Sequence, residues 1–286
     1  MALAQQIIVL FFCVTFSFGQ RIPQALFEPI VVTVAQETRI QELDTISEKT
    51  QAEREELAAL FAITSSYEKS FTLLEALVLD YPDNFDNQFL LGGISGILAS
   101  ELPRTKSLPY VRTMKTAFEN AAQLKPSSLE TQMILLELYT GLPWILGGSN
   151  KKASEKLEVI KSLSVIEGFL SEGFFYRATK KNKKALVAYL NAVNEVQLCN
   201  SQPLELQQNS YYHLAVLAFY LQKDMTKAAC LFSKFLEIHN AGAAYPKSFA
   251  THYLNKILDP ENIDAEMEAT LTEYDKLTAW IQNNFK

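Results

Sequence analysis

The feature that most constrains the fold of this chain is an apolar spacing that returns about every 34 residues. Leu57 and Phe61 are spaced as neighbours on one face of a helix. The same offset recurs 34 residues later at Leu91 and Ser95. A fixed period of this length is typical of repeat architectures, in which each repeat is one small unit of secondary structure.

Each of these predicted helices is followed, after a turn, by a second helix with its own apolar face. Insertions lengthen the connections in the second and third units, at "ASELPRTKSLP" and "GLPWILGGSNKK". The residues that mark the five pairs are Leu57, Ala58, Phe61, Ser70, Leu74 and Leu77; Leu91, Gly92, Ser95, Met114, Phe118 and Ala121; Leu135, Leu136, Tyr139, Ala153, Leu157 and Ile160; Gly173, Tyr176, Ala185, Tyr189 and Ala192; and Tyr212, Ala215, Val216, Phe219, Ala228, Phe232 and Phe235.

Physical chemistry requires such pairs to stack on one another. Helices this short are marginal in water by themselves, and a single hairpin buries only one face of each helix. Small residues such as Gly173 and Ala185 let the backbones approach, while Tyr189 and Phe232 are large enough to fill the space between layers. We therefore predict an all-α chain whose core is distributed along a stack.

The spacing of small and aromatic residues resembles the tetratricopeptide (TPR) repeat, over roughly Gln51 to Gly242. The resemblance implies a right-handed superhelical solenoid of about five helical hairpins, and an exported bacterial TPR-like protein. The domain organisation expected from it is a signal peptide at 1–19, an extended segment and helix at 20–50, a repeat domain at 51–242 and C-terminal capping helices at 243–286. The last of these includes one long helix in "DAEMEATLTEYDKLTAWIQNNF".

The N-terminus predicts export. An apolar run from Ile7 to Phe18 ends in small residues suited to cleavage before Gln20. The run is shorter than the roughly 20 residues that a membrane-spanning helix needs, so we expect a periplasmic or secreted protein without stable membrane insertion after cleavage. Cys199 and Cys230 would then be the remaining thiols, and two parallel helices would hold them too far apart for an intramolecular disulfide.

Residues that would carry catalysis are dispersed along the sequence. His213, His239 and His252 fall in different predicted helices, without the close spacing of a metal site. Net charge is −6 and the basic residues do not cluster, which disfavours a nucleic-acid partner. We expect a protein that is not an enzyme and that uses no metal and no cofactor.

In TPR folds, the first helix of each pair lines a concave groove, and side chains there that stacking does not use are available to a partner. Carried over to this sequence, the resemblance implies a groove formed by Glu55, Phe89, Met133, Glu137, Phe174, Arg177, His213 and Tyr220. Phe89 and Phe174 could instead complete the core. Trp144, in the lengthened turn of the third unit, is either buried against a neighbouring repeat or exposed at the rim of a binding site.

Two functions fit these features. The first is a non-catalytic scaffold or adaptor of the cell envelope that binds a protein or peptide in its groove. The alternative rests on the two long turns, which are similar to those of TPR-like soluble components of TRAP-type transport systems. It would require both turns and Phe174 to converge on a polar cavity.

Overall fold

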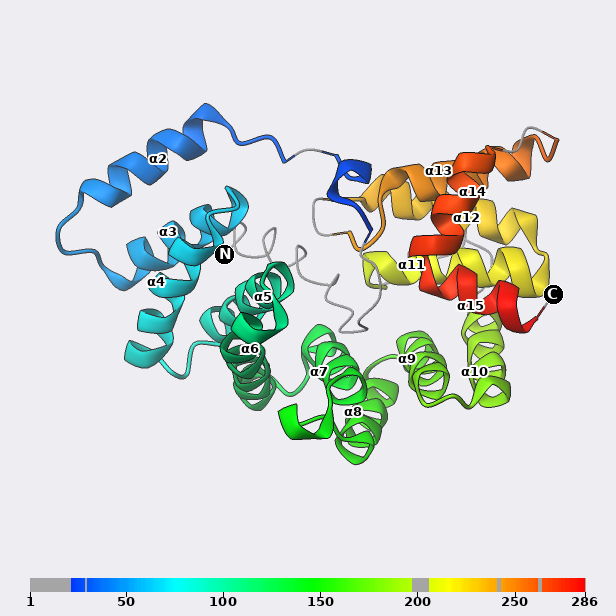
Figure 1. Ribbon diagram of the computed structural model, residues 1–286, viewed down its shortest axis with the longest axis horizontal. Coiled ribbons are helices and arrows are strands. Elements are labelled where there is room, and N and C mark those ends of the chain that lie inside the picture. The colour runs from blue at the N-terminus through cyan, green and yellow to red at the C-terminus, as the bar shows by residue number, and fades with distance from the viewer. Residues whose placement is uncertain (1–21, 29, 197–205, 241–242, 262–263, 286) are drawn as a thin grey trace.

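The protein is an all-α solenoid, seen in a computed structural model that describes residues 22–28, 30–196, 206–240, 243–261 and 264–285 (Figure 1). A short 3₁₀ helix, η2 (Gln24–Leu26), and α2 (Val34–Thr45) precede the stacked pairs. The pairs are α3 (Gln51–Ile63) with α4 (Tyr67–Asp80), α5 (Phe85–Glu101) with α6 (Arg104–Leu124), α7 (Leu129–Gly141) with α8 (Asn150–Leu163), α9 (Val165–Ala178) with α10 (Asn182–Glu195), and α11 (Gln208–Leu217) with α12 (Met225–Ile238).

The predicted all-α stack of five hairpins is confirmed, with the core distributed along it. Each pair packs on the next, and the residues that carry the repeat pattern, among them Ala58, Leu74, Leu135 and Ala185, are fully buried. Several helices begin at a side-chain cap, as at Thr50, where the hydroxyl accepts from the Glu53 backbone N–H and the Glu53 carboxylate accepts in return. The capping residues and the spacing of the buried residues therefore specify the same helices.

The prediction of a long turn in the second pair is wrong. The residues of "ASELPRTKSLP" extend the two helices instead, because α5 ends at Glu101 and α6 begins at Arg104. Pro109 is the sixth residue of α6, so its missing N–H removes one backbone hydrogen bond from the second turn, and the helix continues through it to Leu124. The insertion thus lengthens a hairpin without adding a loop.

The C-terminal segment also differs from the prediction, because the expected long helix is two helices. After α13 (Lys247–Leu258), α14 (Ala265–Tyr274) ends at Asp275 and α15 (Lys276–Asn284) begins there. The buried Asp275 carboxylate accepts hydrogen bonds from the backbone N–H groups of Leu277 and Thr278, and from the Tyr212 hydroxyl of α11 at 2.8 Å. These contacts stop one helix and start the next.

Because of this break, α15 turns back across the fourth and fifth pairs. Its Trp280 ring meets the Tyr189 ring of α10 edge-on, with ring centres 5.6 Å apart, and its indole N–H donates to Asn182 at 3.2 Å. The C-terminal helices therefore cover the α10–α11 junction as well as the end of the stack (Figure 1).

The N-terminal segment joins the two ends of the arc. Ile22 and Leu26 pack against the core of the fifth pair and the C-terminal helices, and Glu28 forms an ion pair with Lys247 of α13 at 3.0 Å. Further along, Leu43 of α2 is buried in a cluster with α3, and Arg39 binds the Glu56 carboxylate of α3 through two hydrogen bonds of 2.8 Å. The first described residues thus connect the last helices to the first pair (Figure 1).

Cys230 of α12 is disulfide-bonded, which contradicts the expectation that no intramolecular disulfide forms. That expectation placed Cys199 on a regular helix. Instead, α10 ends at Glu195, so the axial offset assumed between parallel helices does not hold. Cys199 lies outside the described residues, and so do the partner sulfur of Cys230 and the predicted signal peptide at 1–19.

Candidate functional site

The concave side of the arc is the natural place for a site, since first helices face it and second helices face outward. Figure 1 shows α5, α7 and α9 on the inside of the curve and α6, α8 and α10 on the outside. The N-cap residues Asn84, Ser128 and Ser164 begin the inner helices, each with its side chain accepting a backbone N–H of the first turn. These caps fix the residue at which each inner helix begins.

Five side chains from four helices form what we call the central group: Glu137 of α7, Phe174 and Arg177 of α9, His213 of α11 and Lys276 of α15. Arg177 is the electrostatic centre, because its positive charge acts on Glu137, on His213 and on Lys276. The structure therefore brings the predicted groove residues Glu137, Arg177 and His213 close to Lys276, which was not predicted to lie there.

Burial sets the charge state of this group. It raises the pKa of Glu137 to about 7, against the opposing effect of the positive charges on Arg177 and Lys276. It lowers the pKa of His213 to about 3, with Arg177 adding to the shift. Burial also lowers the pKa of Lys276, as does Arg177, while Glu137 opposes them. His213 is therefore neutral at pH 7.

Arg177 is held by an aromatic face. Its guanidinium carbon lies 5.8 Å from the centre of the Phe174 ring, within the range of a cation–π interaction. Within the described ranges, the guanidinium takes part in no ion pair and no hydrogen bond. A charged group with five donors and a half-buried aromatic neighbour is thus available on the inner face.

His213 is fixed by Tyr245, a residue that the sequence analysis missed. The His213 Nε2 atom lies 2.8 Å from the Tyr245 hydroxyl, and the Tyr245 ring stacks on Tyr212 with centres 4.1 Å apart. Tyr245 precedes α13 in a connecting segment, and Lys276 follows the Asp275 break. Neither lies in a predicted first helix, so the repeat spacing gave no signal for them.

Met133 lies one helical turn before Glu137 on α7 and is half-buried. It packs beside the core cluster of the second to fourth pairs, as Phe174 does. Four of the predicted groove residues, Glu137, Phe174, Arg177 and His213, therefore belong to the central group, and Met133 lies one turn from Glu137 on the same helix.

Glu55 and Phe89, which were predicted to line the groove, make contacts within the fold instead. The Glu55 carboxylate accepts hydrogen bonds of 2.9 Å from the side-chain amides of Asn84 and Asn87, and so ties α3 to the first turn of α5. Phe89 is 1% exposed and meets the Phe118 ring edge-on, with centres 5.4 Å apart. Glu55 therefore ties the first pair to the second, whereas Phe89 packs between the two helices of the second pair.

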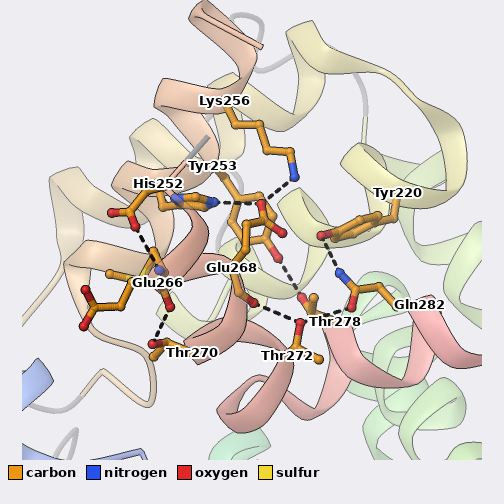
Figure 2. A network of polar contacts seen from close by, with 12 residues as sticks. Tyr220, His252, Tyr253, Lys256, Glu266, Glu268, Thr270, Thr272, Thr278 and Gln282 are labelled. Carbon is orange, nitrogen blue, oxygen red and sulfur yellow. Dashed lines mark hydrogen bonds and ion pairs between the residues drawn. The ribbon is translucent and has the colours of Figure 1, made fainter. Parts of the chain in front are cut away.

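Tyr220 anchors the C-terminal helices. It lies in the π-helical turn η4 (Ala218–Gln222), and its hydroxyl accepts a hydrogen bond from Gln282 of α15 at 3.2 Å. Figure 2 shows this contact beside a second one, in which Glu268 of α14 binds both His252 and Lys256 of α13. Tyr220 therefore holds α15 in place next to the central group.

Trp144 is neither buried nor part of the central group. It lies in the 3₁₀ helix η3 (Trp144–Leu146) after α7, and it is 83% exposed. Of the two alternatives for Trp144, burial against a neighbouring repeat is therefore wrong. The turn packs toward α6 through Gly147, which lies against the Lys115 side chain, and leaves the Trp144 ring in solvent.

Other kinds of site can be considered for the same residues. Among the described residues, no group of three or more histidine, cysteine or acidic side chains is placed to hold a metal ion. Over those same ranges, every helix is too short or too polar to cross a bilayer. The expectation of no metal, no cofactor and no catalysis stays a prediction.

The chain was also compared with known proteins. No protein-family model matches it, and none of the curated proteins does. Among solved structures it is similar to the human IFIT1 dimer with PPP-AAAA, with a TM-score of 0.47 and 20% sequence identity. The similarity covers 78% of this chain and 50% of the IFIT1 chain, so this chain spans about half the length of the protein it matches.

Proposed function

We propose that this protein is a non-catalytic scaffold or adaptor, built from TPR-type repeats, that binds a protein or peptide segment in its concave groove. The observation that carries the proposal is the inner face of α9, where Arg177 lies over Phe174 without an ion pair among the described residues. An aromatic surface beside a cation suits a segment that carries an apolar side chain next to an acidic one.

The charge states support binding more than catalysis. A general acid or base works best with a pKa near the working pH, and His213 has a pKa of about 3 and is bonded to Tyr245. Glu137, with a pKa of about 7, can exchange protons near neutral pH. We propose that it tunes the net charge of the groove.

We further propose a place in the cell envelope, periplasmic or secreted. Two features support it: the apolar run from Ile7 to Phe18, and the disulfide at Cys230, since disulfides persist in oxidising compartments. The alternative, an accessory component of a TRAP-type system, required two long turns to converge with Phe174. One of them is helical in the structure, and the other, with Trp144, lies toward α6 on the outer side, which favours the scaffold.

Selection from a random peptide library tests the proposal. Wild-type protein is used as bait, and the affinity of enriched peptides is measured by fluorescence anisotropy. We expect enriched peptides that pair an acidic with an apolar residue, and at least a tenfold weaker affinity for Phe174→Ala and for Arg177→Glu. The matched control is Arg112→Glu, which reverses an exposed arginine on the outer helix α6 and should leave affinity unchanged.

Two results would refute the proposal. If the enriched peptides bound the Arg177→Glu variant with the same affinity as wild type, the groove would be excluded as the binding site. Cleavage or other chemical change of a bound peptide, seen by mass spectrometry, would contradict a non-catalytic role.

A further inference from the structure

The turn between α7 and α8 exposes an apolar tip that packing does not require. Trp144 is 83% exposed and the adjacent Ile145 is 74% exposed. Within the described part of the chain, the Trp144 indole N–H has no hydrogen-bond partner. Single exposed apolar residues are common on proteins, but two large apolar neighbours at one projecting turn form a small patch whose exposure to water is unfavourable.

The tip is held rigidly. The Ser149 N–H donates to the Tyr139 carbonyl at 2.7 Å, and the Gly148 N–H donates to the Pro143 carbonyl at 3.1 Å. Gly147 has a left-handed φ of 94°, and a Cβ on Gly148 would lie 1.7 Å from the Leu142 carbonyl oxygen, so both glycines are needed for this path. A turn fixed in this way presents Trp144 and Ile145 without the entropy cost of ordering a loop.

Exposed lysines follow the tip in the sequence. Lys151 and Lys152 occupy the first turn of α8, which contains no acidic residue. A helix N-terminus already carries partial positive charge, so two lysines there are locally unfavourable and create a positive surface on a chain of net charge −6. Lys152 lies 3.6 Å from Glu119, whereas Lys151 forms no ion pair among the described residues.

We infer that Trp144, Ile145, Lys151 and Lys152, here called the turn patch, contact the surface of an anionic lipid bilayer. Tryptophan favours the boundary between lipid headgroups and acyl chains, and lysines next to it are attracted to anionic headgroups. The contact is peripheral and involves no spanning helix.

A protein partner fits the patch less well. A stable protein interface needs about 800 Å² from each side, and its core is depleted in lysine. Here the two exposed apolar residues are followed, a few residues later in the chain, by exposed lysines in the first turn of α8. Because the turn patch lies on the outer side of the arc, membrane contact leaves the concave groove open, and the inference does not depend on the proposed function (Figure 1).

Tryptophan fluorescence tests this inference directly. The chain contains two tryptophans, so Trp280→Phe leaves Trp144 as the only tryptophan reporter. This full-length variant is mixed with vesicles of phosphatidylcholine and phosphatidylglycerol in a ratio of 7:3, with and without brominated acyl chains. We expect a blue shift of Trp144 emission and quenching by the brominated lipid. Binding should weaken as salt is raised, because salt screens the lysines.

Variants separate the parts of the patch. A free lysine near an anionic surface contributes a factor of about five in affinity, so Lys151→Gln should weaken vesicle binding of the Trp280→Phe protein about fivefold. Adding Lys152→Gln should have a smaller effect, because Lys152 already pairs with Glu119 and lies over the Tyr139 ring. Replacing Ile145 with serine should reduce the blue shift. The matched control is Leu79→Ser, which removes a single 82%-exposed leucine on α4 and should change neither quantity.

Three results would overturn the inference. Trp144 emission that is unshifted and unquenched by vesicles would exclude lipid contact, whatever other part of the chain binds lipid. An equal response to vesicles of pure phosphatidylcholine would exclude an anionic surface. A shift that survives both the lysine and the Ile145 replacements would show that the turn patch is not responsible.

Discussion

Replacing Gly173 with alanine tests how closely the helices of a pair approach. A Cβ built on Gly173 of α9 would lie 2.3 Å from both Cδ1 and Cε1 of the Tyr189 ring on α10. That ring is 3% exposed, and Trp280 meets it edge-on, so it has little room to move away. The substitution must therefore displace a helix or strain a buried ring.

Two opposing effects set the change in the free energy of unfolding caused by Gly173→Ala. Overpacking a filled core costs about 1–3 kcal/mol, whereas replacing glycine by alanine inside a helix returns about 1 kcal/mol. The overlap at Gly173 involves several ring atoms, so its cost should be near the upper end. We expect the free energy of unfolding, measured by urea denaturation, to fall by about 2 kcal/mol.

Gly92 provides the matched control. A Cβ on Gly92 would lie 2.9 Å from the end of the Phe118 ring, a much smaller overlap, so Gly92→Ala should change stability by less than about 1 kcal/mol. In a Tyr189→Leu background, the cost of Gly173→Ala should shrink because the ring is gone. If Gly173→Ala were as stable as Gly92→Ala, or more stable than wild type, the close approach would be refuted.

Three further predictions concern other parts of the chain. Asp275→Ala should lower the free energy of unfolding by about 2–4 kcal/mol, because it removes the cap of α15 and leaves the buried Tyr212 hydroxyl without its acceptor. The matched control is Asp264→Ala, which removes an exposed cap and should cost only about 1 kcal/mol when both variants are compared by thermal melts. Because the pKa of Glu137 is raised in the folded state, stability should fall as pH rises from about 4.5 to about 7, and Glu137→Gln should flatten that part of a pH series of denaturation curves; an unchanged slope would contradict the raised pKa. Cys230 should resist alkylation in the denatured, unreduced protein and react after reduction, as followed by mass spectrometry, and modification before reduction would exclude the disulfide.

The stack was predictable from the sequence because its cause is local. A small residue on one helix and an aromatic on the next, as at Gly173 and Tyr189, must meet whenever two short helices pair. The same spacing located Glu137, Phe174 and Arg177 on inner helices, where the structure brings them together. Periodicity thus predicts the pairs and a part of the central group.

What could not be predicted depends on contacts between distant parts of the chain. The apolar face of the C-terminal segment continues across Asp275, and the break there combines a local cap with a hydrogen bond from the distant Tyr212. This break places Lys276 where the charge of Arg177 lowers its pKa. Glu55 and Arg177 look equivalent in sequence, as charged residues on first helices. The Glu55 carboxylate accepts hydrogen bonds from two asparagines of the next repeat. That contact depends on how one repeat is rotated relative to the next, which the sequence spacing does not specify.

The central claim is that the concave group around Arg177 is the binding surface, and chemical cross-linking tests it most directly. The tightest peptide from the selection is synthesised with a photo-reactive group, irradiated with the wild-type protein and mapped by mass spectrometry. The account predicts adducts on α7, α9 and α15, close to Glu137, Phe174 and Lys276. Adducts confined to the outer helices α6, α8 and α10 would contradict it.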